Sequence, residues 1–241
     1  MKTITIKRAI VCIMALFIFD SAGAQEDKKT VEINPAVDLV SSYVWRGAYQ
    51  TGASIQPTLT FSYAGFSLTA WGSTDFTTSS DIYRSKEFDL ALGYERGGLS
   101  IILNDYWWSG EGARYGRYSS DHYFEGMIGY HMGESFPLSL SWSTFFAGGD
   151  RDEKGNQQFS TYMEAAYDFT VKGVQVVPAI GISPWTGMYN KAGKSGFSVP
   201  SLSLTATKEI RFSESFSLPL FVQGVVSPEN DDVFLVVGIS F

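Results

Sequence analysis

The chain has 241 residues, of which 15% are aromatic, and contains 24 glycines but a single cysteine, Cys12. Its mean hydropathy of −0.01 excludes a protein built from several membrane-spanning helices. Its formal net charge of −7 argues against nucleic acid as a partner, because binding to phosphates needs a basic surface.

Residues 1–24 have the features of a secretory signal peptide. A basic start precedes the apolar run 9–19, which is too short to span a bilayer as a helix. The small residues 22–24 form the expected cleavage site, near Ala24. Because Cys12 lies inside the apolar run, the mature chain 25–241 is expected to carry no disulfide bond, thiol chemistry or lipid anchor.

From residue 25 onward, apolar and polar residues alternate in one segment after another, which is the period-two pattern of β-strands. In 53–63, apolar residues from Ile55 to Tyr63 alternate with serine, threonine and glutamine. The predicted strands are 31–45, 53–63, 66–77, 85–96, 99–109, 121–132, 137–147, 158–170, 174–185, 197–208, 216–227 and 232–241. The pattern therefore predicts about twelve strands, and ten or fourteen remain compatible with it because predicted boundaries shift by about 2 to 4 residues.

The connections between these segments alternate between short and long. Tight-turn signals occur at 64–65, 97–98 and 172–173, whereas 110–120 and 148–157 are longer polar loops. An even number of strands, each about 10 residues long, with short turns at one end and longer loops at the other, is what a single-chain outer-membrane barrel needs.

The last segment, 232–241, ends the chain on an aromatic residue, Phe241. One of its faces is wholly apolar, and the other is mixed. Such a strand would promote aggregation in water but is expected where a closed barrel meets lipid. The sequence thus predicts an all-β protein, a transmembrane antiparallel up-and-down β-barrel of the cell outer membrane. A soluble secreted β-protein is the alternative. The expected partners are outer-membrane lipid and, through the Phe241 strand, the barrel-assembly machinery.

Inside such a barrel, the polar side of each strand faces the lumen. The acidic residues on that side are Asp38, Glu87, Asp89, Glu125, Glu164 and Asp168. A ring of carboxylates would raise the local cation concentration and disfavour anions. Alternatively, these groups pair with lumenal basic side chains and fill the interior. Arg46, at the end of the first strand, either contacts lumenal carboxylates or a passing anion, or anchors the first outer loop.

We expect no catalytic, cofactor-binding or metal site. Hydrolases of this type need a nucleophile, a histidine and an acid within hydrogen-bond reach. The only histidines, His122 and His131, are nine residues apart on one predicted strand, so they face opposite sides and cannot share a metal ion. His122, near the outer rim, is the better placed to act alone. The acidic run 150–155 hints at a calcium loop, but Lys154 stands where an oxygen ligand is needed, so a solvated loop is expected.

Several aromatic residues gather near the ends of predicted strands. They are Tyr43, Trp45, Trp107, Trp108, Tyr130, Trp142 and Trp185. Girdles at the two membrane interfaces explain this arrangement better than carbohydrate stacking does.

The stretch 42–52, Ser-Tyr-Val-Trp-Arg-Gly-Ala-Tyr-Gln-Thr-Gly, followed by Pro57, resembles the opening motif of the TorF-like porin family. The stretch 65–73 is similar to a second motif of that family. Trp45 and Ser67 depart from the usual phenylalanine and tyrosine. The resemblance implies an outer-membrane barrel of the porin type with no known substrate.

The expected function is passive diffusion of small solutes. The alternatives are a closed structural or adhesive barrel and, less well supported, an outer-membrane enzyme.

Overall fold

The computed structural model describes residues 30–76, 86–214 and 216–241. The predicted signal peptide and the predicted loop 78–84 lie outside these residues. The strands are β1 (Glu32–Val40), β2 (Tyr43–Trp45), β3 (Ala48–Thr51), β4 (Ser54–Tyr63), β5 (Phe66–Asp75), β6 (Lys86–Arg96), β7 (Leu99–Trp108), β8 (His122–His131), β9 (Leu138–Gly148), β10 (Thr161–Tyr167), β11 (Phe169–Val171), β12 (Val174–Ser183), β13 (Ser198–Arg211), β14 (Ser217–Ser227) and β15 (Asp232–Ser240). Within the described part of the chain, no helix is long and apolar enough to cross a membrane.

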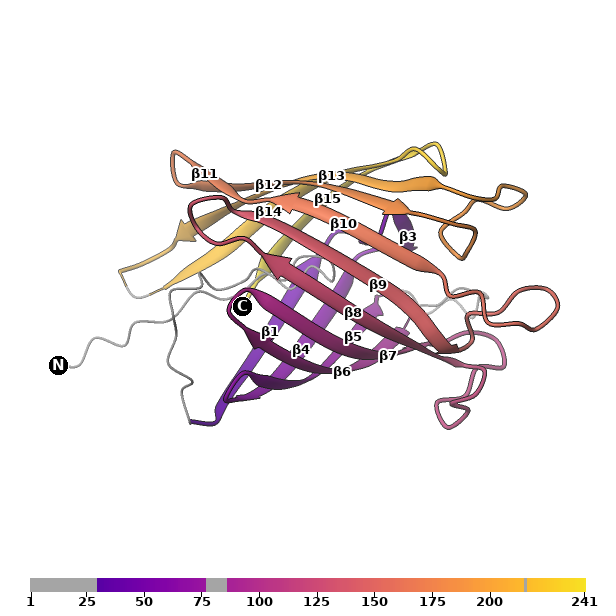
Figure 1. Cartoon of the computed structure of the whole chain (residues 1–241). Helices are drawn as coiled ribbons and strands as arrows, with labels where there is room; N and C mark the ends of the chain where they lie inside the picture. The colour runs from indigo at the N-terminus through magenta and orange to yellow at the C-terminus, as the bar shows by residue number, and fades with distance from the viewer. Residues whose placement is uncertain (1–29, 77–85, 215) are drawn as a thin grey trace.

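The wall strands form a closed antiparallel barrel (Figure 1). Strands that follow one another along the wall pair with each other, and β1 pairs with β15 to close the ring. β10 and β11 act as one wall strand that is interrupted at Asp168, because both pair with β12. Since β2 and β3 stand apart as a separate sheet, the wall has twelve strands, and the predicted up-and-down barrel is confirmed.

The two ends of the barrel differ. At the end where β1 begins and β15 stops, the connections 64–65, 97–98 and 172–173 have positive φ at both residues, as type I′ turns require. We call this the turn end. The longer connections, including 109–121 and 184–197, lie at the opposite end, which we call the loop end.

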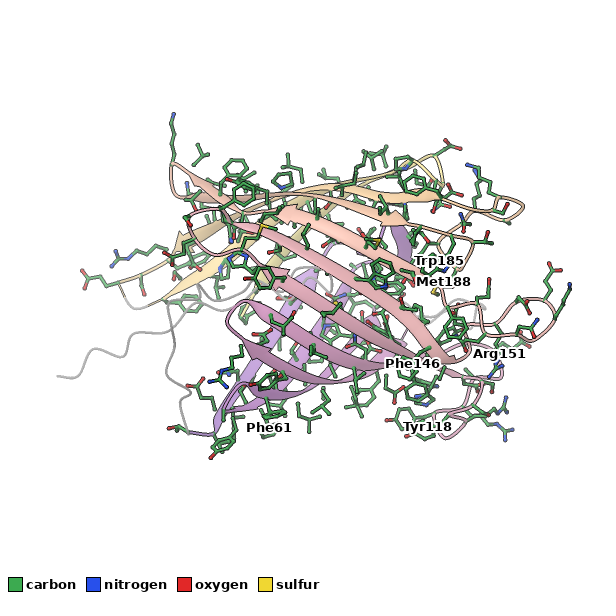
Figure 2. All side chains as sticks on the ribbon, in the orientation of Figure 1. Phe61, Tyr118, Phe146, Arg151, Trp185 and Met188 are labelled. Carbon is green, nitrogen blue, oxygen red and sulfur yellow. The ribbon has the colours of Figure 1, made fainter. Side chains whose placement is uncertain are left out.

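The wall strands expose apolar side chains and bury polar ones. On β4, Phe61 is exposed and Gln56 is buried, and on β15, Leu235 is 69% exposed whereas Ser240 is buried. Figure 2 shows Phe61 and Phe146 on the outer side of the wall. A water-soluble domain has the reverse arrangement, because its apolar residues form the core.

The segment between β1 and β4 does not belong to the wall. The predicted strand 31–45 is wrong beyond Val40. Residues 46–52, which the sequence predicts as the turn between the first two strands, contain β3. Instead, β2 and β3 form a hairpin whose residues Tyr43 and Trp45 are buried in the lumen. Period-two alternation is the same in a wall strand and in an inward hairpin, so the pattern alone could not separate them.

Candidate functional site in the barrel lumen

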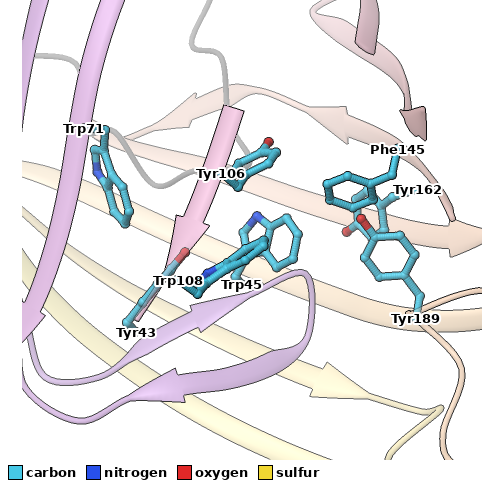
Figure 3. Close-up of a cluster of buried hydrophobic side chains, with 8 residues drawn as sticks. All are labelled: Tyr43, Trp45, Trp71, Tyr106, Trp108, Phe145, Tyr162 and Tyr189. Carbon is cyan, nitrogen blue, oxygen red and sulfur yellow. The ribbon is translucent and has the colours of Figure 1, made fainter. Parts of the chain in front are cut away.

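A cluster of buried aromatic side chains fills the lumen near the loop end (Figure 3). Its members are Tyr43, Trp45, Trp71, Tyr106, Trp108, Phe145, Tyr162 and Tyr189. They come from the β2–β3 hairpin, from wall strands β5, β7, β9 and β10, and from the loop 184–197. We call this group the lumenal aromatic cluster.

The aromatic girdle prediction is wrong for part of its members. Tyr43, Trp45 and Trp108 belong to the lumenal aromatic cluster and do not reach the outer surface. Trp142 and Trp185, by contrast, are exposed on the outer side and pack against each other, with ring centroids 6.0 Å apart. Neighbouring residues on a strand face opposite sides, so proximity to a strand end does not decide which aromatic side chains point outward.

Arg46, at the tip of the hairpin, forms a bidentate ion pair with Glu125 on β8. Arg46 Nη1 donates to Glu125 Oε1 at 2.5 Å, and Nη2 donates to Oε2 at 3.0 Å. The Tyr106 hydroxyl donates to the same carboxylate at 2.8 Å, and Arg46 Nη1 also contacts the Tyr189 hydroxyl. Of the two alternatives for Arg46, the structure thus shows contact with a lumenal carboxylate.

Aromatic rings surround this ion pair. The Arg46 guanidinium carbon lies 4.6 Å from the ring centroid of Trp45 and 4.7 Å from that of Tyr162. The side chain of Arg46 is 7% exposed, and that of Glu125 is 0% exposed. A buried bidentate pair with extra hydrogen bonds and cation–π contacts is costly to break, because either partner alone would leave a charge buried. The pair therefore fastens the hairpin to the wall.

The hairpin tip has a backbone that only a few residues adopt readily. Arg46 and Gly47 both have positive φ, of 48° and 80°, which makes a type I′ turn. A Cβ on Gly47 would lie 1.9 Å from the backbone oxygen of Pro200. Gly47 is thus required both by its φ angle and by the close approach of β13.

We expect Gly47→Ala to lower the free energy of unfolding by about 1 to 3 kcal/mol and to displace the hairpin tip. Urea unfolding and the fluorescence of the buried tryptophans would measure the two effects. Gly112→Ala is the matched control, because Gly112 has a similar φ of 75° but open space where its Cβ would lie. Equal losses in the two variants would mean that the contact with Pro200 is unimportant.

The other predicted acidic residues lie at different places in the wall. Asp38, Glu87 and Asp89 are buried on the inner side. Glu164 accepts a hydrogen bond from the Tyr162 hydroxyl at 3.0 Å, and Asp168 accepts one from Gln175 at 2.5 Å. The structure therefore brings Arg46 and Glu125 together and does not gather the remaining carboxylates around them.

The two histidines face opposite sides of β8, as their spacing predicts. His131 lies 3.0 Å from the Ser139 hydroxyl. His122 is covered by the loop 109–121: its Nδ1 is 2.6 Å from Asp105 Oδ1, and its Nε2 is 2.5 Å from the Tyr115 carbonyl oxygen. Both ring nitrogens of His122 are thus engaged, one by a carboxylate oxygen and one by a backbone carbonyl oxygen. The loop 110–120 was predicted, but the alternation of apolar and polar residues does not indicate that it folds over His122.

The charged run 150–155 forms a loop that is held by hydrogen bonds within it and with Ser160. Asp150 is buried and accepts hydrogen bonds from Ser160, and Asp152 accepts them from Lys154 and Asn156. The hydrogen bonds from Asn156 lower the pKa of the Asp152 carboxyl below its usual value. In the part of the chain that the structure describes, no three histidine, cysteine or acidic side chains are grouped so that they could hold a metal ion.

No protein-family model matches the chain, and no curated protein matches it either. The resemblance of the 42–52 stretch to the TorF-like porin family therefore stays an expectation.

Proposed function

We propose that the protein is an integral β-barrel of the outer membrane, exported by residues 1–24 and inserted by the barrel-assembly machinery. The observation that carries this proposal is the apolar outer face of the wall, on which residues such as Leu68, Ile101 and Leu235 are exposed. In water, an apolar surface that surrounds the whole molecule would cause aggregation. In lipid, a closed barrel satisfies its backbone hydrogen bonds within the wall.

We further propose that the lumen is a narrow acidic path for small solutes, shut at the loop end in this conformation by the β2–β3 hairpin. Barrels of eight strands are filled by side chains, and barrels of sixteen strands enclose an open channel. A barrel of twelve strands lies between them, so its lumen can hold the β2–β3 hairpin and still leave a route for small solutes. The inner carboxylates Asp38, Glu87 and Asp89 support cation preference, because they place negative charge along the path.

A closed structural barrel is the second candidate. It is favoured by the lumenal aromatic cluster, in which Phe145 is fully buried and Tyr106 stacks on Trp108 with ring centroids 5.5 Å apart. In that case the hairpin would be a permanent part of the core.

Planar bilayers distinguish the two candidates. The refolded chain 25–241 is expected to show discrete current steps, with a reversal potential in a salt gradient that indicates cation preference. Glu87→Gln with Asp89→Asn should lower this preference, because two lumenal charges are removed. Glu111→Gln with Glu153→Gln, which removes two charges from exposed loops, is the control. A folded barrel that inserts and never conducts would favour the structural candidate, and an unchanged reversal potential would contradict the acidic path.

A further inference from the structure

A small cavity lies between the hairpin and the barrel wall. Its volume is about 20 Å³, enough for one water molecule or one small ion. On the hairpin side it is lined by Tyr43, and on the wall side by Asp38, Gln56, Gln223 and Trp71. Both aromatic rings among these lining residues belong to the lumenal aromatic cluster (Figure 3), and they meet edge to face with centroids 5.6 Å apart.

Asp38 brings a carboxylate to this cavity. Its side chain is 3% exposed, and its Oδ1 has no hydrogen-bond partner among the described residues. Arg46, the basic residue of the hairpin, is bound to Glu125. A buried carboxylate without a counter-charge is costly, so Asp38 needs either a proton or a cation beside it.

Two glutamines bring neutral oxygen ligands to the same cavity. Gln56 Nε2 donates to the Ser73 hydroxyl at 3.3 Å, and Gln223 Nε2 donates to the Thr205 hydroxyl at 3.1 Å. Because one N–H of each amide is held by a wall hydroxyl, the carbonyl oxygens are the groups that we expect to face the cavity. Carboxylate and carbonyl oxygens are hard ligands that suit alkali and alkaline-earth cations.

We propose that this cavity binds one sodium-sized cation between the Asp38 carboxylate and the carbonyl oxygens of Gln56 and Gln223. A monovalent ion fits better than calcium, which takes 6 to 8 oxygen ligands and more negative charge. The proposal deepens the proposed function, on which it rests, by naming a small inorganic cation as the solute class that the acidic lumen accepts. A cation at this place would link wall strands β1, β4 and β14, which carry the three ligands.

Thermal unfolding in detergent tests the proposal without requiring conduction. The refolded chain 25–241 would be heated in sodium chloride and in choline chloride at equal ionic strength, and unfolding would be followed by circular dichroism. Sodium should raise the unfolding temperature by about 2 to 4 °C over choline, because it binds the folded state and choline is too large for the cavity. Asp38→Asn should abolish this difference.

Asp168→Asn is the control, because it removes a carboxylate that bonds to Gln175 at the break between β10 and β11 and does not line the cavity. This variant should keep the full sodium effect. Equal unfolding temperatures in the two salts would overturn the proposal and leave a water molecule beside Asp38 Oδ1 as the occupant. A sodium effect that survives in Asp38→Asn would also overturn it. A sodium effect without channel currents would support the site while contradicting solute passage.

Discussion

Arg46→Ala is expected to lower the free energy of unfolding by about 3 to 5 kcal/mol and to release the hairpin from the lumen. The change leaves Glu125 buried and unpaired, with only the Tyr106 hydroxyl still donating to it. It also removes the cation that Trp45, Tyr162 and Tyr189 surround. Urea unfolding in detergent would measure the loss of stability, and planar-bilayer recordings should show a higher open probability than in the unmodified protein.

The double variant Arg46→Met with Glu125→Leu separates the role of charge from that of packing. It replaces both members of the pair by apolar side chains of similar size, so most of the stability lost in Arg46→Ala should return, and the open probability should stay near that of the unmodified protein. If Arg46→Ala were as stable as the unmodified protein and conducted no better, the ion pair would not be what holds the hairpin in place.

Leu103→Arg is expected to cost about 2 to 4 kcal/mol in lipid and to reduce the yield of folded protein in vesicles. Leu103 lies on the outer side of β7, is 51% exposed, and stands opposite Leu92 on β6 and Gly126 on β8. In a bilayer this mid-strand position would face the hydrocarbon core. The arginine charge would then lie in hydrocarbon, or its side chain would have to extend to the membrane interface, and both cost free energy. Folding into vesicles, followed by the band shift of unheated samples in SDS gels, would measure the effect.

Leu99→Arg is the control for this variant. Leu99 is on the same strand and the same face but at its turn end, where an arginine near the interface should cost about 0 to 1 kcal/mol. In a water-soluble barrel, both exposed leucines would tolerate arginine within about 0.5 kcal/mol. Two small and equal effects would therefore contradict the membrane location.

The wall of the barrel was predictable because its residues obey a local rule. On β4 and β6, the alternation of apolar and polar residues indicates which side chains face inward, and Gln56, Glu87 and Asp89 are indeed buried. The tight turns were equally predictable, because each contains a glycine at its second position, at 65, 98 and 173. Both inferences use residues only a few positions apart.

The lumenal site was less predictable because it depends on distant contacts. Arg46 and Glu125 are 79 residues apart in the chain, and Tyr189 is 143 residues from Arg46. Whether they meet depends on the inward turn at Ser41 and on the registers of several strand pairs, which alternation does not encode. The sequence therefore identified Arg46 and the lumenal carboxylates as candidates but left their pairing open.

The hairpin is also a separable piece of the chain. Val40 and Ser54 are direct cross-strand partners, the last pair between β1 and β4 at the loop end. An Asn-Gly dipeptide in place of residues 41–53 would therefore close a two-residue turn without changing the register of either strand. In topological terms, β2 and β3 are an insertion between two wall strands that are already in register, so the hairpin can be removed or replaced while the wall stays the same.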